Sequence, residues 1–417
     1  MHGKILAASV VMVSLVFTEA LPQTGVRVPE TLTLEAARSL LINNSPALLS
    51  QRLNIDIEEG DVIHAEKRPN PIFSGGSEGL LSSGERSFFN NQELSLTFRQ
   101  EIETAGKRQK RTRLEQVDVE IAGMNLQNAV RVLTFELKQS YFQVVLAQED
   151  LTLARGILDQ FAGVIRLNRI RYEEGEIAGG DLRRVEAAQY RFYEDVVAAE
   201  VNLENAQDRL LALLGSTDFT QSFEAVDSFD PRFVPPHLQE LKGRALGQRA
   251  DLTAQRTRIA RSDLGIDLEK ARGVPNFSPF VGYRRDFGEN GAIVGVEIPL
   301  FVSNRNEGGI ARAQAERRRQ EQLARLLEVQ VLGEVQLALN ELAGNQRRIE
   351  ALRGEYLEKA LQSRDIAESA YRLGGASLSE FLDAERTYRE TSRLYNRALY
   401  DFQISRAQLE RAIGGDL

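Results

Sequence analysis

Apolar residues recur at nearly every third or fourth position over a long stretch in the first half of the chain. The positions with this spacing are Val130, Leu133, Leu137, Val144, Ala147, Leu151, Ala154, Leu158, Phe161 and Ile165. A sustained seven-residue repeat is typical of long helices that pack side by side and supercoil. Proline is absent between Pro71 and Pro231, so the pattern predicts one helix from Lys107 to Tyr172. At about 1.5 Å per residue this helix would be roughly 100 Å long.

Before this helix the period of the pattern changes to two. Leu94, Leu96 and Phe98 alternate with polar residues, which is typical of a strand with one apolar face. Glycines and a polar loop precede this strand, so residues 72–101 are predicted to form a β-hairpin. Residues 276–300 repeat the pattern and predict a second hairpin. Each strand would have about ten residues, the length of a tilted membrane strand.

The end of the long helix occurs twice in the chain. Residues 172–215 and 371–414 align without a gap, and Gly175 matches Gly374. Each copy reads as a helix end, a glycine-containing turn and a returning helix. The chain is therefore predicted to consist of two similar halves, with a second long helix running from about Asn306 to Leu373.

The N-terminus has the pattern of a secretory signal. Lys4 is followed by an apolar run and by the small residues of a cleavage site, which predicts a signal peptide over residues 1–20. A buried N-terminal helix is the alternative. The remaining predicted segments are a first repeat at 21–215 with a helical hairpin at 107–214, a proline-containing linker at 216–237, and a second repeat at 238–417 with a helical hairpin at 306–413.

Composition excludes several classes of function. The net charge is −8 and the isoelectric point about 5.3, which argues against a nucleic-acid partner. The chain has no cysteine, and its three histidines are far apart in sequence. A histidine-rich metal site and a cysteine nucleophile are thus excluded, and an envelope hydrolase would lack a nucleophile motif. We expect no catalytic residues, no cofactor and no resident metal.

The mature part of the chain has no apolar run long enough for a membrane helix. If the chain crosses a membrane, its strands must do so, and the smallest membrane barrels have about eight strands. Four strands from one chain cannot close a barrel, whereas three chains would supply twelve. Membrane insertion would therefore require an oligomer, and we expect a trimer.

Several short motifs occur in a defined order between Leu32 and Gly414. They read LTLEAA, RPNP at 68–71, GKRQKR at 106–111, EGEIAGGDLRRVEAAQY in the first turn, RADL at 249–252, and GVEIPLFVSNRNEGGIARAQAE after the second hairpin. Their order, spacing and duplication resemble the TolC-type outer membrane efflux protein family. RPNP and VGVEIPLFVSNRNEGGI are most similar to its heavy-metal, CzcC-like branch.

This resemblance implies a mainly α-helical fold with a small β part. It implies a homotrimer with a 12-stranded β-barrel in outer membrane lipid and a long α-helical barrel in the periplasm. Such a trimer is a passive exit duct that works with a periplasmic adaptor (membrane fusion) protein and an inner-membrane pump, here of the RND type. The expected substrate class is heavy-metal cations. The alternative is a periplasmic coiled-coil scaffold without a channel.

The resemblance also assigns three acidic residues to the periplasmic aperture, namely Asp181, Glu380 and Asp383. A ring of carboxylates from three chains would attract cations and repel anions. The alternative is structural: Asp181 and Glu380 would cap the returning helices, or favour their first turns through the helix dipole.

The two turns correspond to the family's adaptor-docking tips. On this basis Gly175, Gly374, Gly375 and Ser377 are assigned to docking, while the simplest role of the glycines is tight-turn geometry. The chain departs from the family at Ala376, where some members carry an arginine that helps to lock the closed aperture.

A basic cluster begins the first long helix, formed by Lys107, Arg108, Lys110 and Arg111. The helix dipole disfavours positive charge at this end, so a compensating partner is expected. We predict contact with anionic headgroups or phosphate at the periplasmic face of the membrane. A solvated run of charges is the alternative.

Overall fold

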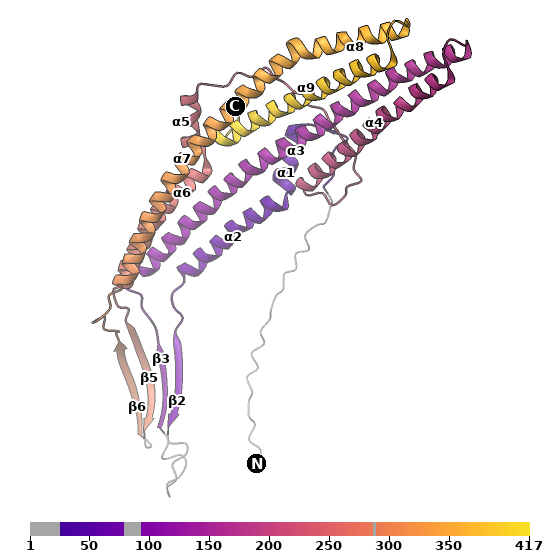
Figure 1. The fold of residues 1–417 in the computed structure, drawn as a ribbon. Coiled ribbons are helices and arrows are strands. Elements are labelled where there is room, and N and C mark those ends of the chain that lie inside the picture. Colours follow the sequence, from indigo (N-terminus) through magenta and orange to yellow (C-terminus); the bar gives the residue numbers. More distant parts are fainter. Residues whose placement is uncertain (1–25, 79–92, 287–288) are drawn as a thin grey trace, which may run out of the picture.

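A computed structural model describes residues 26–78, 93–286 and 289–417. The predicted signal peptide at 1–20 lies outside the described residues. The molecule is elongated, with a small sheet at one end and the tips of two helical hairpins at the other (Figure 1). Among the described helices, none has the length and apolarity that a membrane-crossing helix needs.

The first half is organised around α3 (Lys107–Glu173), a single helix of 67 residues that matches the predicted one. Its first residue follows Gly106, which has a left-handed φ of +69°. α4 (Gly179–Leu213) returns along the tip-side part of α3, and α2 (Pro46–Glu66) covers the sheet-side part. The two shorter helices thus follow one another along the same partner (Figure 1).

Short elements complete the first half near the middle of the molecule. α1 (Leu34–Asn44) precedes α2, and β1 (Thr31–Leu32) pairs in parallel with β4 (Glu224–Ala225). Side chains from α1, α3 and α4 form the largest apolar cluster here, around Tyr141, which is fully buried.

The second half repeats this plan with one difference. α5 (Leu238–Gln248) and α6 (Ala250–Arg272) precede α7 (Glu307–Ala351), and α9 (Leu378–Ile413) returns from the tip. The predicted second long helix is present, and it contains one π-helical turn, η1 (Leu352–Tyr356), between α7 and α8 (Leu357–Arg372). This turn contains Gly354, which favours a helix weakly, and none of its residues is buried, so packing does not enforce α-helical geometry there.

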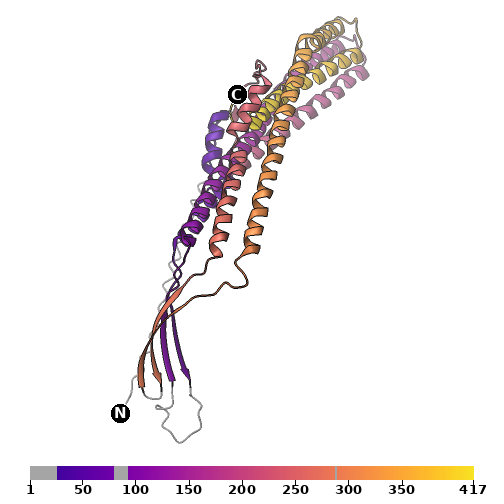
Figure 2. The same cartoon turned by 90° about the vertical axis from the view of Figure 1, so that its left-hand side faces the viewer.

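The four long strands form one antiparallel sheet in the order β2-β3-β5-β6. Their bounds are β2 (Ile72–Glu78), β3 (Glu93–Arg99), β5 (Ser278–Asp286) and β6 (Glu289–Glu297). The hairpins of the two halves meet through β3 and β5, with Phe98 opposite Val281. Figure 2 shows the four strands side by side, leading into the helices.

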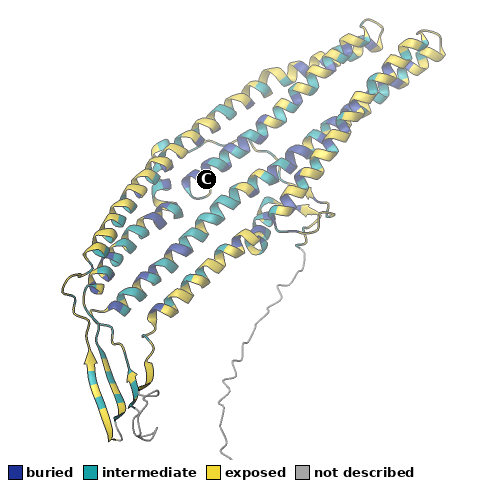
Figure 3. Ribbon diagram, turned by 60° about the horizontal axis from the view of Figure 1, so that its bottom comes forward, coloured by how far each residue is buried: buried dark blue, intermediate teal, exposed yellow. Residues whose placement is uncertain are grey.

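Buried residues follow the facing sides of the helices. Figure 3 shows them as a dark blue line along the long helices, while the sheet is exposed or intermediate. Of the ten apolar positions that predicted the long helix, seven are buried, and Val130, Leu133 and Leu158 are partly buried against the same clusters. The heptad pattern therefore identified the packing face of α3.

We predict that Tyr141→Phe destabilises the middle of the molecule by about 1–3 kcal/mol. The Tyr141 hydroxyl donates to the Leu32 carbonyl at 2.8 Å, lies 2.6 Å from Asp227 Oδ2 and accepts from the Asp227 N–H at 3.3 Å, so its loss removes these bonds and leaves the Asp227 N–H without an acceptor. Thermal unfolding of the purified protein measures this effect. Tyr193→Phe is the control because Tyr193 is 54% exposed, and equal unfolding temperatures for the two variants would contradict the prediction.

Candidate functional site

The two turns at the hairpin tips have the same backbone path. Gly175 and Gly374 both have a φ of +79°, a left-handed conformation that favours glycine. The residue after each of these glycines makes an equivalent backbone hydrogen bond. The Glu176 N–H donates to the Arg171 carbonyl, and the Gly375 N–H donates to the Ala370 carbonyl, both at 2.8 Å. Gly375 itself has no positive φ, so the turn does not require glycine there.

Helix α9 begins with a complete capping box. The Ser377 hydroxyl accepts from the Glu380 N–H at 3.3 Å, and Glu380 Oε2 accepts from the Ser377 N–H at 2.7 Å. The pKa of Glu380 is lowered because its carboxylate accepts from the Ser377 N–H and, second, from the Ser377 hydroxyl at 3.0 Å. Glu380 therefore has the structural role of a first-turn acid, and its role at an aperture stays a prediction.

The first tip lacks this box. Ala178 is the N-cap of α4 and makes no side-chain bond, so the expectation that Asp181 caps this helix is wrong. Asp181 lies instead in the first turn, where it favours the helix dipole and pairs with Arg184 at 3.3 Å. Equivalent positions in the two tips thus begin their helices by different means.

The three predicted aperture acids do not converge within the described part of one chain. Asp181 belongs to α4, whereas Glu380 and Asp383 belong to α9, and no ion pair or shared cavity links all three. Asp383 lines a groove of about 380 Å³ between α4 and α9. The groove also contains Arg184, Arg191, Arg386 and Arg389. Three of these arginines are neutralised by ion pairs, Arg184 with Asp181, Arg386 with Glu390 and Arg389 with Asp195.

Contacts between the two hairpins near their tips were not visible in the sequence. Arg171 Nη2 donates to the Arg372 carbonyl at 2.7 Å, close to the end of α8. The buried Tyr371 hydroxyl donates to Asn168 Oδ1 at 2.8 Å. Phe161 and Phe381 stack in the apolar cluster beside them, at 6.3 Å between ring centroids. These contacts join α3 to α8 and α9.

The sequence repeat between residues 172–215 and 371–414 only partly indicated which residues make these contacts. Tyr172 aligns with Tyr371, but Tyr172 is 48% exposed and Tyr371 is 8% exposed. Glu186 aligns with Glu385, and Glu186 pairs with Arg169 at 3.2 Å while Glu385 is 4% exposed. Burial raises the pKa of Glu385, which nearby Arg364 partly opposes. The second hairpin buries these positions against the first hairpin.

Lys107, in the basic cluster, finds its partners inside the chain. It is 8% exposed, and its ammonium group donates to the Val274 carbonyl and to Asn276 Oδ1. The positive charge at this helix start is therefore stabilised by oxygens of the second half, rather than by lipid or solvent.

Arg111 is also paired within the chain. It forms a two-pronged contact with Glu103, at 2.8 and 3.3 Å, and donates to the Ala65 carbonyl at the end of α2 at 3.2 Å. Lys110 contacts the Asp267 carbonyl at 3.3 Å. Membrane contact stays a prediction for the cluster, and these internal bonds leave Arg108 as its most available member.

The sheet has two chemically different faces. One face is mainly apolar and contains Phe73, Leu94, Leu96, Phe98, Val281, Tyr283, Val294 and Val296, with Arg285 opposite Leu94 at its loop end. The opposite face contains ion pairs, Arg99 with Glu297 at 2.9 Å and Arg284 with Glu93 at 3.2 Å. The outer strands β2 and β6 each have one neighbour in the described sheet.

The sequence model described as "Outer membrane efflux protein" matches residues 37–216 and 241–415. The chain belongs to the outer membrane efflux protein family. The predicted family is therefore confirmed, as is its location in the outer membrane with a long helical part in the periplasm. The predicted fold class is also confirmed in its helical hairpins and small sheet.

Individual members of the family resemble the chain along most of its length. The cobalt-zinc-cadmium resistance protein CzcC of Cupriavidus metallidurans is 27% identical over 390 residues, which cover 92% of this chain and 90% of that protein. The probable outer membrane lipoprotein SilC of Salmonella typhimurium is 23% identical, with 90% and 84% covered. The crystal structure of CusC, 20% identical, has the same fold with a TM-score of 0.74 and covers 92% of each chain.

We predict that Ser377→Ala weakens the start of α9 by about 1 kcal/mol and that Ala178→Ser strengthens the start of α4 by a similar amount. Asp181 is already in place to complete a box with a serine at 178. Hydrogen exchange of the first-turn amides of the two helices measures both effects. A change of the same sign in the two variants would contradict the capping explanation.

The Ser377 box should also depend on pH. The folded-state pKa of Glu380 lies below its ordinary value of 4.5. The stability that the capping box adds to the start of α9 is therefore fully present above pH 4.5. It is lost as the pH falls through the folded-state pKa. In Ser377→Ala, the protection of the first-turn amides of α9 from hydrogen exchange should fall less as the pH is lowered. If the pH profile were the same as in the unsubstituted protein, Glu380 would not act through the capping box.

Proposed function

We propose that this outer membrane efflux protein is the passive exit duct of a tripartite efflux system and acts as a homotrimer. Three sheets would close a 12-stranded barrel in outer membrane lipid, and six helical hairpins would form the periplasmic tube. The observation that supports this most directly is the two-faced sheet. An apolar face suits lipid, and a face with ion pairs such as Arg99 with Glu297 suits a wet interior.

The direction of the outer strands supports closure between chains. Successive pairs in the order β2-β3-β5-β6 are all antiparallel, so β6 runs opposite to β2. A β6 strand placed beside β2 of the next chain would continue the antiparallel alternation. Unpaired backbone groups at an edge are costly in lipid, and closure pairs them.

The length of the helices supports a link across the periplasm. α3 has 67 residues and would extend roughly 100 Å from the sheet to the tip. We place adaptor docking at the tips, with Gly175, Gly374 and Gly375 in the turns and Ser377 at the start of α9. An inner-membrane pump of the RND type would supply the energy, and the duct itself would perform no catalysis.

Heavy-metal cations are the substrate class we propose. The relative that supports this is named a cobalt-zinc-cadmium resistance protein and is 27% identical to this chain. In the trimer, exposed carboxylates at Asp181, Glu380 and Asp383 would repeat three times around the aperture and favour cations. The cation would be cargo in transit rather than a bound cofactor.

We predict that cysteines on β2 and β6 crosslink neighbouring chains. The chain contains no cysteine, so paired substitutions can be introduced without background. Ser74→Cys combined with Gly291→Cys, Ile293→Cys or Gly295→Cys should give a covalent trimer with a short bifunctional maleimide in at least one combination. Denaturing electrophoresis measures the product.

Ser74→Cys with Thr97→Cys is the matched control, since these residues are opposite each other within the β2–β3 hairpin. Its crosslink should stay within one chain. If the three β2–β6 pairs gave no product larger than a monomer, and the protein were recovered from the soluble periplasm, the coiled-coil scaffold would replace the duct.

We predict that the double variant Asp181→Asn, Asp383→Asn lowers the cation preference of the channel. A carboxylate about 4 Å from an ion in water contributes about 1 kcal/mol, so relative permeability should change on the order of fivefold. Reversal potentials in planar bilayers under a salt gradient measure this preference. Glu240→Gln, which removes an exposed acid from α5 away from the tips, is the control and should have no effect.

A further inference from the structure

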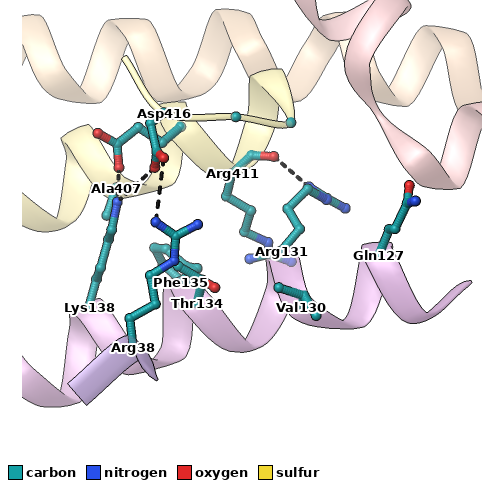
Figure 4. A pocket seen from close by; sticks show the side chains of 13 residues that line it. Arg38, Gln127, Val130, Arg131, Thr134, Phe135, Lys138, Ala407, Arg411 and Asp416 are labelled. Atoms are coloured by element: carbon teal, nitrogen blue, oxygen red, sulfur yellow. Dashed lines mark hydrogen bonds and ion pairs between the residues drawn. The ribbon is translucent and has the colours of Figure 1, made fainter. Parts of the chain in front are cut away.

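A small cavity near the middle of the molecule has more positive than negative side chains in its lining. It has a volume of about 180 Å³ and lies between α1, α3, α9 and the segment after α9 (Figure 4). Its charged lining consists of Arg38, Arg131, Lys138, Arg411, Glu410 and Asp416. Four positive charges thus face two carboxylates in a space large enough for a small ion with some water.

The two carboxylates neutralise this cavity unequally. Glu410 forms a close ion pair with Lys138. Asp416 lies 3.6 Å from both Arg38 Nη1 and Lys138 Nζ, and its side chain is 65% exposed. Figure 4 shows Arg38 and Lys138 reaching Asp416 from α1 and α3. Ion pairs of this length and exposure are weak, so Asp416 is a displaceable counter-charge.

Two hydrogen-bond donors of the cavity have no partner among the described residues. The Thr134 hydroxyl oxygen is buried and makes no hydrogen bond there. Arg411 forms no ion pair in the described part of the chain, and its guanidinium lies over the Phe135 ring at 5.1 Å. A buried hydroxyl without a partner is unfavourable, and a ligand oxygen would satisfy it.

The neighbouring Arg131 shows that the positive charge is incompletely balanced. It contacts Asn128 and the Arg411 carbonyl, and it pairs with Asp251 at 3.4 Å. Burial lowers the pKa of Arg131, and the like charges of Arg249 and Arg411 lower it further, against the opposing effect of Asp251. An additional anion would relieve this repulsion.

We propose that this cavity binds a compact tetrahedral oxyanion, with phosphate as its simplest form. Arg411, Arg38 and the Thr134 hydroxyl would donate to it, and Asp416 would move aside. Donors that come from three helices suit an ion with oxygens on all sides better than a planar carboxylate. The bound ion would join α1, α3 and α9.

The ion would come from solution rather than from a lipid. Arg131 lies 24 residues after the first residue of α3, which is roughly 36 Å along the helix from the sheet end. This distance is beyond the reach of a headgroup at the membrane surface. The proposed site is also separate from the hairpin tips and does not depend on the export function.

Isothermal titration of the purified full-length protein with inorganic phosphate, at constant ionic strength in chloride, tests the proposal. We expect saturable binding with one site per chain. Arg411→Gln should weaken it by about tenfold or more, the effect of one charge-assisted hydrogen bond. Arg397→Gln is the matched control, because Arg397 is on the same helix and over the Tyr400 ring but pairs with Asp401 outside the cavity.

Two further variants separate binding from a structural role. Thr134→Val keeps the charge and approximate shape of the site and should also weaken binding. Asp416→Asn removes the competing carboxylate and should tighten it. Absence of saturable binding, equal losses in Arg411→Gln and Arg397→Gln, or a failure of Asp416→Asn to tighten binding would each overturn the proposal. Acetate that bound as tightly as phosphate would overturn the tetrahedral preference.

Discussion

Burial of the apolar stripe on α3 is the interaction on which the rest of the structure depends. A helix of 67 residues gains most of its stability from packing along its length rather than from its own propensity. α2 covers its sheet-side part and α4 its tip-side part, while α6 and α9 contact it from the second half. The returning direction of α4, the position of α2 and the docking of the second half all follow from this one requirement.

The two halves are joined at both ends of the molecule. At one end β3 pairs with β5, so the hairpins form one sheet instead of two separate ribbons. At the other end Arg171 bonds to the last carbonyls of α8, and Asn168 accepts from Tyr371. Any separation of the tips within one chain must break these polar contacts and expose the stacked rings of Phe161 and Phe381.

Charge is distributed unevenly along the molecule. The sheet has its ion pairs on one face, and the base of α3 uses carbonyl and carboxylate oxygens to stabilise Lys107 and Arg111. The cavity near Arg411 has four positive side chains and two carboxylates in its lining. The overall charge of −8 therefore conceals local regions of the opposite sign.

The sequence by itself determined the elements and their order, since periodicity and turn residues are local properties. The heptad stripe ending at Ile165, the alternation around Leu96 and the matching Gly175 and Gly374 were sufficient for the long helix, the strands and the two tips. The π-turn at Gly354 was not predictable, because a single glycine inside a helical pattern does not reveal whether packing will maintain α-helical geometry.

Only the tertiary structure decided what each candidate residue touches. Tyr172 and Tyr371 occupy the same place in the repeat, yet one is exposed and the other is buried, because only the second lies against the other hairpin. Lys107 likewise bonds to Asn276, which is 169 positions away. Periodicity predicts which face of an element is buried, but the partner of a polar side chain depends on which distant segment packs there.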